Sequence, residues 1–142
     1  MKFSERIIEW QNLHGRNNLP WQTNDPYKVW VSEIMLQQTQ VSTVIPFYEN
    51  FMKSFPNVLT LSKANLDEVL KNWAGLGFYR RARNLHQTAK IITDKYHQVF
   101  PDNYEDLVAL PGIGESTAGA ILALALSLIH ISEPTRLSHI SY

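Results

Sequence analysis

Apolar residues recur every three or four positions along most of the chain, which is the spacing of one face of an α-helix. Tyr27, Trp30 and Ile34 follow this spacing, and so do Phe47 and Phe51. No alternation of period two recurs and no internal repeat is evident, so the predicted fold class is all-α. We expect helices over residues 3–14, 26–35, 44–55, 66–73, 78–96, 104–110 and 115–126.

Capping side chains mark several of the expected helix starts. Asp25 precedes Pro26, which suits an N-cap followed by a proline in the first turn. Asn65 stands three residues before Glu68, the spacing of a capping box. Pro46 is expected in the first turn of its helix, because a proline deeper inside would remove a backbone hydrogen bond.

The composition narrows the class of protein. The 142 residues suit one domain, and 44% hydrophobic with 18% charged residues is typical of a globular chain. No apolar run reaches the about 18 residues of a membrane helix. The absence of cysteine excludes disulfide, zinc–thiolate and iron–sulfur ligands from this chain. Thirteen basic and thirteen acidic residues cancel, so net charge offers no support for nucleic-acid binding.

Residues 110–114, Leu-Pro-Gly-Ile-Gly, join two short predicted helices. Gly112 and Gly114 permit backbone conformations and close approaches that a side chain would block. The turn leads into a helix N-terminus, where unpaired N–H groups favour a phosphate. Glycines alone favour an ordinary helix–helix turn. The longer string over residues 110–121, Leu-Pro-Gly-Ile-Gly-Glu-Ser-Thr-Ala-Gly-Ala-Ile, favours a helix-hairpin-helix that holds one DNA backbone without reading bases.

Two further segments belong with this hairpin. Residues 26–41 read Pro-Tyr-Lys-Val-Trp-Val-Ser-Glu-Ile-Met-Leu-Gln-Gln-Thr-Gln-Val, and residues 73–86 read Trp-Ala-Gly-Leu-Gly-Phe-Tyr-Arg-Arg-Ala-Arg-Asn-Leu-His. In this order, the three segments resemble the helix-hairpin-helix base-excision glycosylases, and within them the adenine DNA glycosylases. The resemblance covers most of residues 1–127, with the helix-hairpin-helix near residues 104–126. It implies the N-terminal part of a helical glycosylase domain.

The resemblance implies hydrolysis of the N-glycosidic bond of adenine mispaired with 8-oxoguanine or guanine, after the base has been flipped out of the duplex. Glu33 matches the family's catalytic glutamate, which would protonate N7 of adenine and later help water to reach the sugar. Such an acid needs a raised pKa, which burial beside Trp30 and Ile34 would supply. A lone glutamate is more often a surface residue of an amphipathic helix, and only the surrounding motif reverses that interpretation.

The first segment ends in amide side chains that are expected to contact DNA. Gln37, Gln38 and Thr39 lie at this helix end, and glutamine pairs with base edges because it both donates and accepts hydrogen bonds. By resemblance, Gln38 wedges into the duplex near the lesion. Without the motif, the same residues would be interpreted as a solvated helix terminus.

The second segment adds aromatic and basic candidates. Phe78 stands where the family usually has a tyrosine that inserts beside 8-oxoguanine, so the ring is retained and the hydroxyl is lost. Tyr79 suits either the core or a DNA contact. Arg81 forms a basic cluster with Arg80 and Arg83, which is either a solvated helix face or a phosphate contact.

Ser116 distinguishes two related activities. The endonuclease III branch has a lysine after Gly-X-Gly-X, and this lysine attacks the sugar to form a Schiff base. Ser116 has no amine, so the resemblance implies a monofunctional glycosylase without an efficient lyase step. The expected DNA contacts of the hairpin are Gly112, Gly114, Ser116 and Thr117.

Some of the family pattern has no counterpart in this sequence. The family's catalytic aspartate follows the second hairpin helix, where this chain has Glu133-Pro134-Thr135, and we transfer no role to Glu133. The four cysteines of the family's 4Fe–4S cluster and the domain that recognises 8-oxoguanine are also missing. We therefore expect the chain to be truncated and inactive alone, with residues 128–142 a non-family tail of artefactual origin.

The implied partner is double-stranded DNA with an adenine mispair, bound by a monomer in the bacterial cytoplasm, at the nucleoid and without a membrane. Two other functions stay open: a related glycosylase for another mispaired base, and a non-catalytic helix-hairpin-helix module. Glu33 in its motif argues against the module, and Ser116 argues against a lyase. A metalloenzyme has little support, because the five histidines show no His-X₃-His pair.

Overall fold

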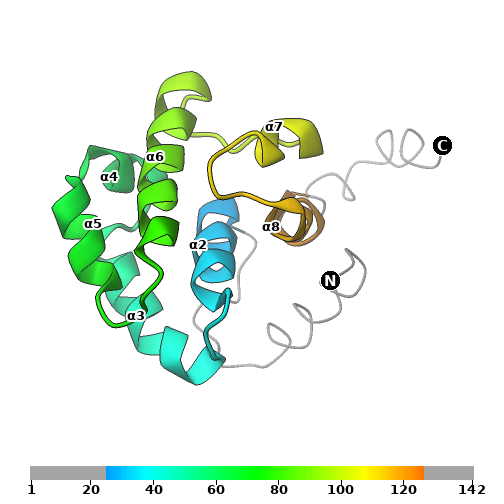
Figure 1. Ribbon diagram of the computed structural model, residues 1–142. Coiled ribbons are helices and arrows are strands. Elements are labelled where there is room, and N and C mark those ends of the chain that lie inside the picture. The colour runs from blue at the N-terminus through cyan, green and yellow to red at the C-terminus, as the bar shows by residue number, and fades with distance from the viewer. Residues whose placement is uncertain (1–24, 127–142) are drawn as a thin grey trace.

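The computed structural model describes residues 25–126, and every regular element in this part of the chain is helical (Figure 1). The predicted all-α fold is confirmed. The helix expected over residues 3–14 and the tail over residues 128–142 lie outside the described residues. The elements are α2 (Pro26–Leu36), α3 (Val41–Ser54), α4 (Val58–Lys63), α5 (Leu66–Trp73), α6 (Tyr79–Lys95), α7 (Tyr104–Val108), α8 (Glu115–Ala120) and a π-helical turn η1 (Ile121–Leu126).

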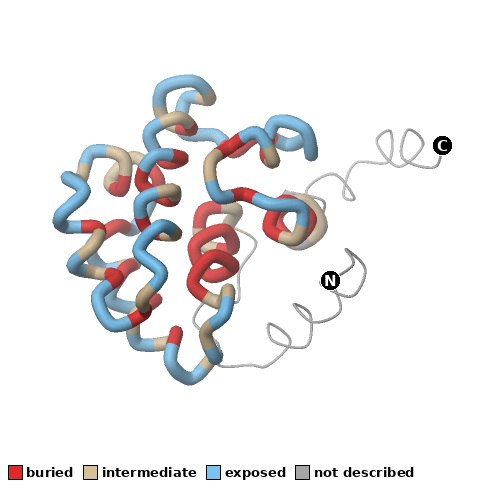
Figure 2. Tube along the Cα trace, in the orientation of Figure 1, coloured by how far each residue is buried: buried red, intermediate tan, exposed pale blue. Residues whose placement is uncertain are grey.

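The helix α2 is the central element of the described part. In Figure 1 it appears between α6 and α8, with α4 and α5 on the far side of α6. Every residue from Val29 to Met35 is buried, and Figure 2 shows this stretch as a continuous red segment. It packs against α3, α8 and η1. A helix that is enclosed on all sides needs apolar side chains all round, and α2 departs from this only at Ser32 and Glu33 within the buried stretch.

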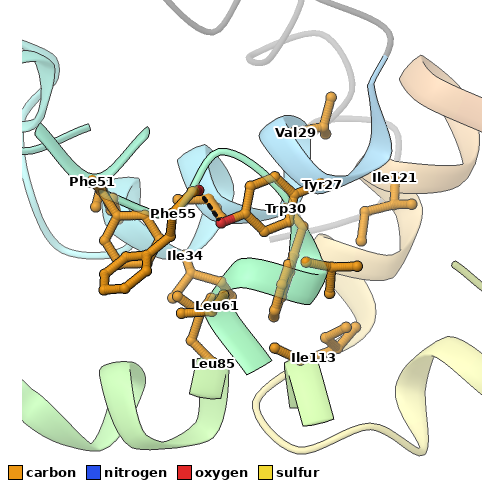
Figure 3. Packing of buried hydrophobic residues seen from close by; sticks show 14 of the residues in the cluster. Tyr27, Val29, Trp30, Ile34, Phe51, Phe55, Leu61, Leu85, Ile113 and Ile121 are labelled. Carbon is orange, nitrogen blue, oxygen red and sulfur yellow. Dashed lines mark hydrogen bonds between the residues drawn. The ribbon is translucent and has the colours of Figure 1, made fainter. Parts of the chain in front are cut away.

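Aromatic side chains fix the neighbours of α2. Trp30 meets Phe100 edge to face with 5.4 Å between ring centroids, and Tyr27 donates a 2.6 Å hydrogen bond to the carbonyl oxygen of Phe55 (Figure 3). Phe51 of α3 meets Trp73 at 6.1 Å. Such ring pairs stabilise a core by about 0.5–1.5 kcal/mol each beyond their buried area. The ring pairs hold α2 against the loop before α7, and α3 against the end of α5, while the hydrogen bond of Tyr27 joins α2 to the end of α3.

The predicted caps at Asp25 and Asn65 are confirmed. The Asp25 carboxylate accepts a hydrogen bond from the Tyr27 amide at 3.0 Å, and Pro26 is the first residue of α2. The Asn65 side chain accepts from the Glu68 amide at 2.9 Å and donates to the Glu68 carboxylate at 3.3 Å. The contacts from the Tyr27 and Glu68 amides satisfy backbone donors that a helix start otherwise leaves without a partner.

The prediction for Pro46 is wrong. The helix α3 begins at Val41, so Pro46 lies inside the helix beyond its first turn. The chain turns into the helix at Gln40, whose carbonyl accepts from the amides of Thr43 and Val44. A proline at this depth cannot donate to the carbonyl four residues earlier, at Ser42. Both Ser42 and Pro46 are exposed, so water can bind this carbonyl in place of the missing donor.

Short elements differ most from the expectations. The helix α4 was not predicted, because its six residues are too few to show a helical period. Its cap, Asn57, accepts from the amide of Thr60 at 2.9 Å. The last expected helix is also divided, since α8 ends at Ala120 and η1 continues in π-helical register. Over residues 25–126, the structure has no helix long and apolar enough to cross a membrane.

Candidate nucleic-acid interface

Three segments that lie far apart in the sequence meet in one open groove. The end of α2 and the start of α6 lie on the same side of the molecule (Figure 1), and the start of α8 completes the surface. We call it the groove. Its lining residues are Gln37, Gln38, Phe78, Arg80, Arg81 and Ser116.

In the turn after α2, the side chain of Gln38 is exposed and that of Gln37 is bonded within the protein. Gln37 caps α2, and its side-chain amide donates to the Thr117 hydroxyl at 3.4 Å. Thr39 donates from its hydroxyl to the Gln37 carbonyl at 3.4 Å. Gln38 is exposed and has a left-handed backbone with φ of 61°. Of the two glutamines that line the groove, the predicted wedge residue Gln38 is therefore the exposed one, while Gln37 and Thr39 hold the turn in place.

Phe78 has an unfavourable backbone and an exposed ring. Its φ and ψ are 52° and 56°, in the left-handed region, and its side chain is 58% exposed. A left-handed conformation costs a residue with a side chain about 1–2 kcal/mol, and an exposed ring regains little of this through burial. Such strain clusters at functional sites. Tyr79 follows it and is 44% exposed, so it belongs to the surface rather than to the core.

The guanidinium of Arg81 is bonded within the protein. Its Nη1 donates to the carbonyl oxygens of Ile34, Met35 and Gln37 at 2.8, 3.2 and 2.6 Å. Burial lowers the pKa of this guanidinium. The expected phosphate contact of Arg81 stays a prediction, and the structure gives its side chain another set of partners. The other two members of the basic cluster, Arg80 and Arg83, are exposed.

The hairpin rests on α6 through contacts that sequence reasoning missed. The hydroxyl of Thr88 donates to the Pro111 carbonyl at 2.6 Å. Gly112 has φ of +79°, and a Cβ placed there would lie 2.8 Å from the Cβ of Asn84. Asn84 and Thr88 are four residues apart on one face of a helix, which was the available signal. A glycine is therefore required at position 112 by both backbone and space.

The other hairpin residues divide between groove and core. Gly114 has φ of −92°, and a Cβ placed there would meet no atom within 4 Å. Nothing inside the described part of the chain requires glycine at position 114. The backbone of this residue is exposed and is accessible from outside. Ser116 lines the groove, whereas Thr117 is 3% exposed and accepts the hydrogen bond from Gln37.

Glu33 is buried inside α2 with 1% of its surface exposed. The interpretation as an ordinary surface glutamate is therefore wrong. It lies four residues before Gln37, so the two share one face of the helix. Next to the groove, α2, α6 and the hairpin enclose a cavity of about 60 Å³. That volume admits several water molecules, since one needs about 10–15 Å³, but it is too small for a purine.

The described residues offer no metal centre. They contain no group of three or more histidine, aspartate or glutamate side chains suited to a metal ion, and the whole sequence has no cysteine. The groove itself presents amides, a hydroxyl, an aromatic ring and cations.

Comparisons with known proteins agree with this geometry. Residues 31–128 match the family described as HhH-GPD superfamily base excision DNA repair protein. The chain is 54% identical over 127 residues to the adenine DNA glycosylase of Buchnera aphidicola subsp. Baizongia pistaciae, covering 89% of this chain and 36% of that protein. It is 40% identical over 133 residues to the human adenine DNA glycosylase, covering 87% and 24%. The chain thus spans about a third or less of the length of these relatives.

Solved structures show the same fold. A thermostable thymine-DNA glycosylase superposes with a TM-score of 0.73 at 28% identity, covering 88% of this chain and 58% of that one. A non-covalent endonuclease III–DNA complex superposes with a TM-score of 0.70 at 18% identity, covering 100% and 68%. The second likeness concerns the fold alone. The family match spans most of the sequence, so the chain belongs to the HhH-GPD superfamily of base excision DNA repair proteins.

Proposed function

We propose that this chain is the N-terminal part of a monofunctional adenine DNA glycosylase that acts on adenine opposite 8-oxoguanine or guanine. The observation that carries the proposal is the buried Glu33, which lies one helical turn from a groove lined by all three family segments. Relatives called adenine DNA glycosylase, from Buchnera to human, support the choice of base.

Double-stranded DNA is the proposed ligand of the groove. The side chains of Gln38 and Phe78 are exposed at its wall and are available to enter a duplex beside the mispair. Gly114 offers backbone that a phosphate can approach, and Ser116 lies beside it at the groove. Since the net charge is zero, binding depends on this local arrangement together with exposed cations such as Arg80.

In the proposed reaction, the flipped adenine accepts a proton from Glu33 at N7. The bond between N9 and C1′ of the sugar then breaks, and its electron pair leaves with the protonated base. A water molecule bonds to C1′ and gives up a proton to the Glu33 carboxylate, which restores the acid. Burial away from water favours the neutral form of a carboxyl group, which such a proton donor requires.

Two parts of the family machinery find no match in these 142 residues. No segment after the hairpin resembles that of the family's catalytic aspartate, and Glu133 lies outside the described residues. Loss of one preorganised group that stabilises transition-state charge typically lowers a rate about 10²–10³-fold. The family's 4Fe–4S cluster needs four cysteines, and the chain has none, so the residues present do not fit the cluster. We derive no step through it.

Ser116 selects between the proposed activity and a lyase. A lyase in this family attacks the sugar with a lysine amine and leaves a Schiff base on the protein. A serine hydroxyl cannot form this intermediate. We therefore propose an abasic site in an intact strand as the product.

A sister glycosylase for another mispaired base is the second candidate. The likeness to the thymine-DNA glycosylase structure and the phenylalanine at position 78 favour it. A module that only binds DNA is less well supported, because a buried carboxyl group such as that of Glu33 has a desolvation cost without a benefit to binding.

The proposal is tested with an extended chain, in which residues 1–127 continue into the C-terminal remainder of the Buchnera relative. Duplexes carry adenine opposite 8-oxoguanine, adenine opposite guanine, or thymine opposite guanine. We expect adenine excision from the first two, with strand cleavage only after alkali, and little or no excision by the 142-residue chain. Excision of thymine alone would establish the sister activity, and binding without excision of either base would support the non-catalytic module.

A further inference from the structure

The first turn of α6 contains a cation that serves another helix. Nη1 of Arg81 approaches three carbonyl oxygens at the end of α2, at 2.6–3.2 Å. The last carbonyls of a helix lack intrahelical donors and carry partial negative charge, so a cation there is favourable. At the start of its own helix the same cation is unfavourable. The position of Arg81 is therefore explained by α2 and not by α6.

The same guanidinium lies against two rings. It is 5.5 Å from the ring centroid of Trp73 and 5.3 Å from that of Phe78. Its Nη2 donates to the Gly77 carbonyl at 3.5 Å. Arginine is suited to this combination because its planar group stacks on rings while its edge donates several hydrogen bonds. One side chain thus joins the turn after α2 to the turn before α6.

We propose that Arg81 is a positioning residue that fixes Gln38 and Phe78 relative to each other, so that both enter DNA from one preformed wall of the groove. This inference rests on the proposed function in that DNA is the ligand. It assigns Arg81 no phosphate. Its partly buried guanidinium would have to leave the carbonyls of α2 to reach one, whereas the exposed Arg80 lines the same groove and needs no such change.

The salt dependence of binding separates the two roles. The extended chain carries Glu33→Gln to prevent turnover, and its affinity for the duplex with adenine opposite 8-oxoguanine is measured by fluorescence anisotropy between about 50 and 200 mM salt. Loss of one phosphate contact reduces the slope of log K against log salt by about 0.9. We expect this reduction for Arg80→Met, the matched control. For Arg81→Met we expect an unchanged slope and roughly tenfold weaker binding at every salt concentration, because two side chains lose their order.

Lysine at position 81 supplies a second readout, which also covers the case in which Arg81→Met fails to fold. A phosphate contact is restored by any cation, but lysine cannot stack on the rings and donate to all three carbonyls with a planar group. We expect Arg81→Lys to bind as weakly as Arg81→Met while its circular dichroism remains that of the parent. A reduced salt slope in Arg81→Met, or parental affinity in Arg81→Lys, would overturn the proposal.

Coupling to Gln38 tests positioning directly. If Arg81 orders Gln38, the substitution Gln38→Ala weakens binding in the parent but has little further effect beside Arg81→Lys. Additive losses would contradict the proposal. These binding measurements do not depend on excision. Failure of the extended chain with native Glu33 to remove adenine would therefore refute the proposed function and leave the result for Arg81 standing.

Discussion

The starts of α5 and α6 are close in sequence but obey opposite rules. At α5, Asn65 caps the helix with a 2.9 Å hydrogen bond, and acidic residues occupy the first turn. At α6, Phe78 is left-handed and provides no side-chain cap, and the first turn holds Arg80 and Arg81. The first arrangement is locally favourable and the second is locally unfavourable.

This difference indicates what each helix start is for. The start of α5 is capped by a neighbouring side chain, and the helix ends with Trp73 in the core. The start of α6 is held by distant partners, since the carbonyls of α2 bind Arg81. Proteins violate local rules where a functional arrangement requires it, and the compensation comes from elsewhere in the fold. At the start of α6 these violations lie at the groove.

The largest expected effect is the loss of adenine excision when Glu33 of the buried helix α2 is replaced. In the extended chain, Glu33→Gln should lower adenine excision by about 10²–10⁴-fold, the usual contribution of a general acid or base. Binding should be retained, because the amide has nearly the same shape. Single-turnover excision and anisotropy measure the two quantities. Retained turnover would remove Glu33 from its proposed role.

Substitution of the two hairpin glycines should have different effects, one mainly on stability and the other mainly on DNA binding. Gly112→Ala should destabilise the extended chain by about 1–3 kcal/mol, because its φ is +79° and the added Cβ meets Asn84. Gly114→Ala should change stability by about 0.5 kcal/mol or less yet weaken DNA binding, since its surroundings are open. Urea unfolding and anisotropy provide the comparison. Equal stability losses would contradict this distinction between the two sites.

At α5, the substitution Asn65→Ala should cost about 1 kcal/mol of stability and leave DNA affinity unchanged, because it removes a cap remote from the groove. Asn50 provides the matched control, as it is exposed inside α3. Asn50→Ala should leave stability unchanged or raise it slightly, since alanine has the higher helix propensity. A loss of DNA affinity in Asn65→Ala would place α5 in the interface and break the comparison.

At the start of α6, replacing Phe78 should have the smallest effect on stability and should still impair recognition of the mispair. Asparagine tolerates the left-handed region, so Phe78→Asn should leave stability unchanged or raise it by up to about 1 kcal/mol. Preference for 8-oxoguanine over guanine opposite adenine should fall. Tyr104→Asn is the control, because Tyr104 is 42% exposed and does not line the groove. A marked destabilisation in Phe78→Asn would show that the contact of its ring with Arg81 outweighs the strain of its backbone.

The sequence predicted what local chemistry decides. The caps at Asp25 and Asn65 depend on neighbours within three residues, and both were readable. Pro46 was misplaced because its effect depends on where the helix begins, and solvent tolerates its missing donor. The helix α4 was missed because the apolar residues of a six-residue helix are too few to show a helical period.

The site could be predicted only through the family motifs. The apolar residues around Glu33 indicate a buried helix, but the burial of the carboxyl group itself depends on α3, α8 and η1, which close around α2. The partners of Arg81 are equally distant, since Gln37 precedes it by 44 residues. Charge and spacing therefore suggested a phosphate contact, and only the fold revealed the carbonyls that Arg81 binds.

The locally unfavourable turns at Gln38 and Phe78 are proposed to form the surface that meets DNA. Amide hydrogen exchange of the extended chain with Glu33→Gln, with and without the mispaired duplex, tests it most directly. We predict slower exchange on DNA binding at Gln38, Phe78 and Gly114, and no change over residues 65–68 at the start of α5. Protection over residues 65–68 without protection at Phe78 would contradict the claim.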